Sequence, residues 1–281
     1  MKNYGINWQK ELADQKESDE IYGAGSVVGL VQIPLEDREK YLPIGELQNI
    51  GSEKMDCASR SPVNDIATQV TFLFENGMSV ENKKWLLDNG YIGENGRPDF
   101  SDCYIAILSG TTPEGNSLIA PLQAIHEFGL IPKSMLPQIS SFDEYYNPAR
   151  ITDAMKKLGK EFITRFPIRY QRVYEEDFSE LSKKFLLGVA GYAWPSPVNG
   201  EYPRVDRQPN HAFVIYKPEY YAFDNYIAND SFMKKLASNF DFLGYGYRLY
   251  IVKEVILQGQ ISVKNSLFQR LWGWICGFFA V

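Results

Sequence analysis

Apolar residues in the first half of the chain recur at helical spacing. A helix with one apolar face is predicted over residues 62–76 by the spacing of Val63, Ile66, Val70 and Leu73. Amphipathic spacing with capping residues or a closing glycine predicts further helices at 79–90, 115–129, 151–162 and 176–188. The first half is therefore predicted to be mainly helical.

The second half changes to strand-like patterning. Alternating or clustered β-branched and aromatic residues, separated by Pro, Gly and Asn, form the segments VAGYAW (189–194), HAFVIYK (211–217), EYYAFDNY (219–226) and YGYRLYIVKEVIL (245–257). Helices followed by strands predict an α+β fold, with a cleft where the helical half meets the β-rich half.

The two ends of the chain have their own patterns. Residues 1–20 are polar and charged and predict a loosely held segment, and 21–43 predict an extended arm with one strand. The tail at 261–281 is very apolar, so we expect it to be covered rather than left in water. Three possibilities stay open for the tail: packing on the protein's own body, docking on a partner subunit, or contact with a membrane surface.

Composition narrows the class of protein. The 281 residues are 44% hydrophobic and 23% charged, which is typical of a globular chain with one large or two small domains. A net charge of −6 argues against a nucleic-acid-binding surface. No apolar run is long enough to span a membrane, and the N-terminus lacks the apolar core of a signal peptide. We therefore expect no nucleic-acid partner, no transmembrane segment and no classical secretion.

Cysteine and histidine counts limit the possible chemistry. The cysteines, Cys57, Cys103 and Cys276, are odd in number and match no zinc-binding spacing, so we expect no disulfide framework, metal site or cofactor. Of the two histidines, His126 lies in a predicted helix that should pack inward, and we assign it and Cys103 structural roles. Any reaction that needs an imidazole is then left with His211.

Cys57 and His211 form the candidate catalytic pair. A nearby imidazolium favours the thiolate and can later protonate a leaving group. His211 opens a predicted strand, and a turn at 217–218 returns the chain to Asp224 and Asn225, either of which can orient the imidazole. Gln48 is the candidate side-chain donor to an oxyanion, together with the backbone N–H of Cys57.

Two residues beside Cys57 bear on whether it forms a thiolate. Asp56 disfavours the thiolate if its charge points inward. Pro62 predicts that a regular helix starts at about residue 59 or later, because proline is tolerated in the first turn of a helix. Cys57 would then lie just before the helix, or the first turn of the helix would be distorted.

The order of these residues resembles that of the papain-like (C1-type) cysteine peptidases. The segments that carry the resemblance are PEGNSLIAPLQAIHEFGLIP (113–132), HAFVIY (211–216), FDNY (223–226) and LGYGYRLYIV (243–252). More closely, YLPIGELQ (41–48), DCASRSPVND (56–65) and DFSDCYIAILSGTTPEGN (99–116) resemble divergent C1-like proteins of bacteriophages and metagenomes. The loop between Gln48 and Cys57 is longer than in the family, and Ala58 stands where an aromatic residue is usual.

The resemblance implies a papain-like α+β fold over residues 41–260, after an N-terminal arm at 1–40. Its helical half would span about 41–165, and its antiparallel β-rich half about 166–260. Within the site, Cys57 would be the nucleophile, His211 the base, Asp224 (or Asn225) the orienting residue and Gln48 the oxyanion donor. Tyr226 falls where the family has a shielding aromatic residue.

Two functions follow from the resemblance. The first is a phage-encoded thiol peptidase acting on peptide or protein substrates, with an amidase on peptidoglycan stem peptides as a variant. The second is an inactive papain-like component of a phage particle, docked on phage structural proteins by the apolar tail. Host cytoplasm or virion would be the location.

Overall fold

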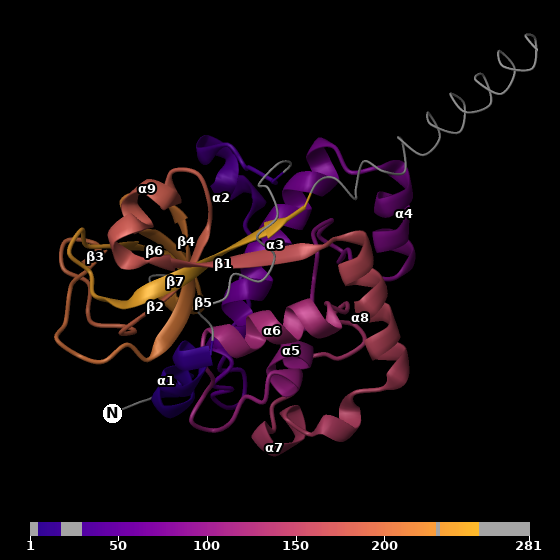
Figure 1. Cartoon of the computed structure of the whole chain (residues 1–281), viewed down its shortest axis with the longest axis horizontal. Coiled ribbons are helices and arrows are strands. Elements are labelled where there is room, and N and C mark those ends of the chain that lie inside the picture. The colour runs from indigo at the N-terminus through magenta and orange to yellow at the C-terminus, as the bar shows by residue number, and fades with distance from the viewer. Residues whose placement is uncertain (1–4, 18–29, 229–230, 253–281) are drawn as a thin grey trace, which may run out of the picture.

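Most of the helices precede the sheet along the chain, as the patterning predicts (Figure 1). The computed structural model describes residues 5–17, 30–228 and 231–252. Its α-helices are α1 (Trp8–Glu17), α2 (Arg38–Tyr41), α3 (Cys57–Asn76), α4 (Val80–Asp88), α5 (Asp102–Leu108), α6 (Ile119–Phe128), α7 (Phe142–Tyr145), α8 (Asp153–Arg165) and α9 (Phe178–Ser182). Short 3-10 turns are η1 (Leu35–Asp37), η2 (Pro148–Arg150) and η3 (Glu175–Asp177).

The strands follow in the second half. They are β1 (Ile168–Tyr174), β2 (Leu187–Gly191), β3 (Glu201–Tyr202), β4 (His211–Lys217), β5 (Tyr221–Ala228), β6 (Ser231–Leu236) and β7 (Phe242–Ile251). The predicted α+β class, with a helical N-terminal half and a β-rich C-terminal half, is confirmed.

Most of the predicted elements are present, with some errors at their ends. The helices predicted at 79–90, 115–129 and 151–162 correspond to α4, α6 and α8, and β4 matches its segment residue for residue. The helix predicted at 176–188 is too long, because the chain leaves α9 and enters β2, where every residue is buried. Sequence patterning missed α1, α2, α5, α7, β1, β3 and β6.

The strands form one sheet in the order β1-β7-β2-β4-β5-β6-β3 within the described residues. Every pairing is antiparallel except that of β3 with β6, which is parallel. β4 lies in the middle and is buried on both faces. Ala212 and Val214 face a core shared with the helices, whereas Phe213 and Ile215 face a second, mainly aromatic core on the other side.

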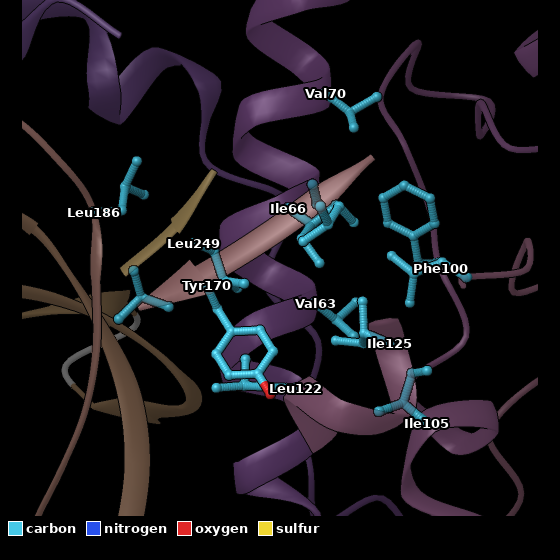
Figure 2. Packing of buried hydrophobic residues seen from close by; sticks show 14 of the residues in the cluster. Val63, Ile66, Val70, Phe100, Ile105, Leu122, Ile125, Tyr170, Leu186 and Leu249 are labelled. Atoms are coloured by element: carbon cyan, nitrogen blue, oxygen red, sulfur yellow. The ribbon is translucent and has the colours of Figure 1, made fainter. Parts of the chain in front are cut away.

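Helix α3 is the central support of the larger core. Figure 2 shows Ile66 and Val70 on α3 between two groups of side chains. Phe100, Ile105, Leu122 and Ile125 come from the helical half, and Tyr170 and Leu249 come from strands β1 and β7. A helix buried on both sides in this way is fixed relative to the sheet, so its first residue has a defined position.

Two polar side chains of α3 bond directly to the sheet. The Ser61 hydroxyl donates to the Phe213 carbonyl at 3.0 Å and accepts from Tyr247 at 2.8 Å. Further along, the Gln69 amide donates to the Leu249 carbonyl at 3.0 Å and accepts from the Ile251 N–H at 3.1 Å. These bonds satisfy buried backbone groups of β4 and β7 and fix the rotation of α3.

Among the helices of the described ranges, none has the length and apolar character needed to cross a membrane. The predicted tail at 261–281 lies outside the described residues, as do residues 1–4 and 18–29 of the predicted arm. The strand expected within 21–43 is absent from its described part, where an isolated bridge at Leu30 is followed by η1 and α2.

We expect Gln69→Leu to lower the free energy of unfolding by about 2–3 kcal/mol, because two buried backbone groups lose their partner. Gln123→Leu, the same change at an exposed site of α6, should stay within about 0.5 kcal/mol of wild type. Urea denaturation of the variants measures both values. Equal effects would show that Gln69 does not anchor α3.

Candidate active site

Cys57 is the first residue of the 20-residue helix α3. The expected helix start at about residue 59 or later is wrong, and Pro62 lies inside the helix, in its second turn. The Asp56 carbonyl closes the first turn by accepting from the N–H groups of Ser59 (2.8 Å) and Arg60 (3.0 Å). Burial of the whole first turn outweighs the cost of the proline. The thiol therefore lies at the positive end of the helix dipole, where negative charge is favoured.

The Asp56 carboxylate is bonded to other side chains. One oxygen accepts from Arg60 Nε at 2.9 Å, and the other accepts from the Tyr145 hydroxyl at 2.6 Å. Arg60 Nη1 also lies 2.9 Å from Asp102. Because a buried arginine offsets this charge, Asp56 is not the uncompensated anion beside the thiol that the sequence suggests.

Asp224, rather than Asn225, contacts His211. The His211 Nε2 atom lies 2.5 Å from Asp224 Oδ1, and both side chains are fully buried. In the β4–β5 pair, Val214 faces Phe223. Successive side chains on a strand point to opposite faces, so Asp224 shares the face of His211 and Asn225 points the other way. This alternation decides between the two candidates that the sequence left open.

Asn225 and Gln48 belong to a neighbouring set of contacts. The side-chain amide of Asn225 accepts from the Asn64 side chain and donates to the Glu46 backbone carbonyl, each at 2.9 Å. The backbone carbonyl of Asn225 accepts from the backbone N–H of Gln48 at 3.1 Å. The side-chain amide of Gln48 donates to Glu53 at 2.5 Å. The predicted oxyanion donor is thus buried beside the site with its amide bonded to a carboxylate.

Glu53 connects Gln48 with the residues around the imidazole. Its Oε1 atom also accepts from the Met55 N–H at 3.2 Å, and its Oε2 atom accepts a short hydrogen bond from Tyr226. The Tyr226 ring lies 5.1 Å from the His211 ring in edge contact, so the aromatic residue predicted near the imidazole is in place. The sequence contains no local signal for Glu53.

Trp194 and Lys234 complete the surroundings of Asp224. The Trp194 indole donates to Asp224 Oδ2 at 2.6 Å, and its ring lies 5.9 Å from that of His211. Lys234 Nζ lies 3.1 Å from the same oxygen. Sequence reasoning missed both residues, although the alternation of Phe232, Lys234 and Leu236 along β6 is a signal that Lys234 faces inward.

The N-terminal segment passes over the thiol. A Cβ atom on Gly5 would lie 2.8 Å from Cys57 Sγ and 2.6 Å from the Met55 carbonyl oxygen. Gly5 has a φ of +124°, a backbone conformation that favours glycine. Cys57 is only 1% exposed as a result of this and the surrounding packing.

Backbone hydrogen bonds hold this segment between the two halves of the fold. Asn116 donates to the Gly5 carbonyl at 2.7 Å and accepts from Asn7 at 2.9 Å, and Ile6 donates to the Asn210 carbonyl at 3.4 Å. The Ile6 side chain is buried. The expectation of a loosely held N-terminus is therefore wrong for these residues, because pairing and burial replace the solvation of a polar segment.

Charge and burial shift the pKa values of the His211–Asp224 pair in opposite directions. Burial alone lowers the pKa of His211, but Asp224 and the Cys57 thiol, both hydrogen-bonding neighbours, raise it from 6.5 to about 10. Burial alone raises the pKa of Asp224, but His211 and Lys234 lower it from 3.8 to about 2. The contacts therefore favour an imidazolium–carboxylate pair at neutral pH.

The other cysteine and histidine candidates lie on different elements. Cys103, on α5, is buried and bonds to the Tyr145 carbonyl and Arg150 at 3.3 Å each, and burial raises its pKa to about 12. His126 lies half-buried in the last turn of α6. The described residues contain no group of His, Cys, Asp and Glu arranged to hold a metal ion. Cys276 lies outside the described residues.

A cavity of about 270 Å³ lies beside this site. Residues of both halves line it, among them Glu46, Asn64, Lys133 and Asn225. Cys57, His211 and Asp224 are not part of its wall. The cavity thus adjoins the loop that carries Gln48 rather than the thiol.

The comparisons with known proteins give structural likenesses only. No protein-family model and no curated protein sequence matches the chain. One similar solved structure is the Amb a 11 cysteine protease of ragweed pollen in its proform, with 10% identity and a TM-score of 0.48 over 86% of this chain and 74% of that one. Xylellain, a cysteine protease from Xylella fastidiosa, has 13% identity and a TM-score of 0.46 over 82% of this chain and 93% of that one. A structure from work on the mite allergens Blo t 1 and Der p 1 has 10% identity and a TM-score of 0.43 over 88% of this chain and 78% of that one.

The His211–Asp224 pair should make stability depend on pH in two ranges. Asp224 contributes stability that is present above pH 3.8 and lost as the pH falls toward 2. His211 contributes stability that is present below pH 6.5 and lost as the pH rises toward 10.

In Asp224→Asn, urea denaturation between pH 6.5 and 10 should show a much smaller loss of stability than in wild type. Asp88→Asn, on an exposed pair with Lys84, should keep the wild-type pH dependence, and parallel curves for Asp224→Asn and wild type would contradict the pairing.

Displacing the N-terminal segment should expose Cys57. We expect Ile6→Asp to speed alkylation of Cys57 by iodoacetamide at least about tenfold, because keeping a carboxylate in that buried position costs well over the ~1.4 kcal/mol that a factor of ten represents. Peptide mass spectrometry gives the rates of Cys57 and Cys103 separately, and Cys103 should not change. Leu12→Asp, at an exposed position of α1, is the matched control. An unchanged Cys57 rate in Ile6→Asp would show that the segment does not cover the thiol.

Proposed function

We propose that this protein is a papain-like cysteine hydrolase that cleaves amide bonds in peptides or proteins. Cys57 is the nucleophile, His211 the general acid and base, and Asp224 the residue that orients His211. The proposal rests on one observation above all: a thiol at the N-terminus of a buried helix neighbours an imidazole whose Nε2 atom lies 2.5 Å from a buried carboxylate.

The proposed reaction proceeds through a thioester on Cys57. The Cys57 thiolate attacks the carbonyl carbon of the scissile amide, and the electron pair of the C=O bond moves to oxygen. As the C–N bond breaks, protonated His211 gives its proton to the departing amine. Neutral His211 then takes a proton from water, which attacks the thioester carbonyl and releases the acid. The thiolate and the imidazolium are restored.

Asp224 supports this cycle by holding His211 in one orientation. With Nε2 directed at Asp224, Nδ1 is the ring nitrogen left to exchange protons with the thiol and the leaving group. The carboxylate also stabilises the imidazolium that forms when Cys57 is a thiolate.

Gln48 and the backbone N–H of Cys57 are the proposed oxyanion donors. As the first N–H of α3, the Cys57 group has no partner within the helix. The Gln48 amide already donates to a carboxylate oxygen of Glu53, which is the type of acceptor that an oxyanion presents. In this proposal Glu53 releases Gln48, and the segment at Gly5 leaves the thiol, before a substrate binds.

The backbone contacts beside the thiol support a peptide as substrate. Ile6 forms a parallel bridge with Asn116 of the helical half, and its N–H donates to the carbonyl of Asn210 next to His211. A peptide that replaces this segment could use the same backbone N–H and C=O groups, as in strand addition. Peptidoglycan stem peptides present similar amide groups and remain a variant of the proposal.

A second candidate function is an inactive papain-like component of a phage particle. The buried thiol and the bond between Gln48 and Glu53 are the observations that favour it. Its proposed docking element, the apolar tail at 261–281, lies outside the described residues. The phage origin comes from the resemblance in sequence and stays a prediction.

A peptidyl vinyl sulfone, which reacts irreversibly with catalytic thiols, separates the two functions. We expect labelling at Cys57 in the full chain, faster in Ile6→Asp, and at least about 100-fold slower in His211→Ala, because the thiolate loses its imidazolium. His126→Ala, at the other histidine, should label like wild type. If Cys57 labels no faster than Cys103, or equally fast without His211, the hydrolase proposal fails and the inactive component is favoured.

A further inference from the structure

Lys234 is a buried cation at the far end of the His211–Asp224 pair. Its side chain is inaccessible to solvent, and Nζ lies 3.1 Å from Asp224 Oδ2. Nζ also donates to the Tyr226 carbonyl at 2.5 Å and lies 5.2 Å from the centre of the Trp194 ring. Its three contacts therefore all go to residues that pack around His211.

A purely structural role does not explain this lysine well. Taking an ammonium group out of water costs several kcal/mol, and a buried ion pair stabilises a fold no better than apolar side chains that fill the same space. The next residue, Lys235, shows the common alternative, since its partly exposed side chain pairs with the exposed Glu219. We therefore expect the inward-facing Lys234 to affect the charge state or position of the groups that it contacts.

The charges of the proposed site indicate what that effect is. In the reactive state the Cys57 thiolate contributes −1, the His211 imidazolium +1 and the Asp224 carboxylate −1, which leaves −1 in a buried space. Lys234 adds +1 and brings the sum of these four groups to zero. Asp224 can then stay ionised and accept from His211 without an excess of negative charge that would hold the imidazolium proton too tightly.

We propose that Lys234 is a positioning residue of the site: it keeps Asp224 ionised and in place beside His211, and it limits how strongly Asp224 retains the proton on His211. The purpose of this role rests on the proposed hydrolase function, but the effect on His211 can be measured without any substrate.

The direction of the effect follows from the groups around the imidazole. The titratable groups that face the His211–Asp224 pair, directly or through Tyr226, are Cys57 on α3, Tyr226 on β5, Glu53 before α3, Tyr202 on β3 and Lys234 on β6. Replacing Lys234 by a neutral residue removes the positive charge and leaves the acidic groups in place. His211 should then hold its proton to a higher pH, because less positive charge opposes the imidazolium.

The test is an NMR titration of the imidazole rings in the full chain. The two histidines give two sets of ring signals, which His126→Ala assigns, and His126 serves as the internal reference. Lys234→Met removes the charge, and Lys234→Gln removes it but keeps a donor for the Tyr226 carbonyl. Lys235→Met makes the same change in net charge at a partly exposed side chain on the other face of the strand.

We expect both Lys234 variants to raise the titration midpoint of His211 by about one pH unit, with His126 unchanged. Lys235→Met should move it by less than about 0.3 unit, because solvent screens that charge. Equal His211 midpoints in wild type and in folded Lys234 variants would overturn the proposal. So would failure of both Lys234 variants to fold while Lys235→Met folds, because Lys234 would then be a residue of the core.

The result of the His211 titration is independent of the labelling result that tests the hydrolase proposal. A shifted His211 midpoint together with an unreactive Cys57 would support the role of Lys234 and refute only the activity. Vinyl sulfone labelling that depends on His211, together with an unshifted midpoint, would support the activity and refute only the role of Lys234.

Discussion

The buried ion pair between His211 and Asp224 is the interaction on which the rest of the site depends. Removing two charged groups from water is costly, and the structure compensates with contacts from several elements. Trp194 and Lys234 bond to the outer carboxylate oxygen, and Asn225 N–H donates to the inner one at 2.7 Å. The order of strands β4, β5 and β6 brings these groups together, so the sheet is the scaffold that makes the pair possible.

The same structure also holds the site closed. Gly5 covers the thiol of Cys57 from one side, and Glu53 engages the Gln48 amide from the other. Both contacts come from chain segments outside the main helices and strands, whereas Cys57 lies at the start of α3 and His211 on the central strand β4. In our proposal, opening moves residues 5–7 and the loop before α3 and leaves α3 and β4 in place. Cys57 and His211 would then stay fixed, while residues 5–7 and the loop before α3 control access to them.

The sequence predicts the parts of this arrangement that depend on local patterning. Strand β4 and the return to Asp224 follow from alternation and a turn, and the amphipathic pattern locates the body of α3. Packing overrides the local rule at Pro62, because a buried first turn keeps the helix intact. The contacts of Gly5 with Cys57 and of Glu53 with Tyr226 lack a local signal, since they join segments that are separated by long stretches of chain. Lys234 has a signal in the alternation along β6, but the patterning did not predict that strand.

In our proposal, Cys57 forms a covalent acyl-enzyme and His211 transfers the protons of the reaction. Rapid-quench mass spectrometry of the full chain with an activated peptide ester tests it most directly. Our account predicts an acyl group on Cys57 that forms and then disappears as product accumulates, and that does not form in His211→Ala. The absence of an acyl group on Cys57 in the wild-type and Ile6→Asp proteins, or acylation no faster than at Cys103, would contradict it.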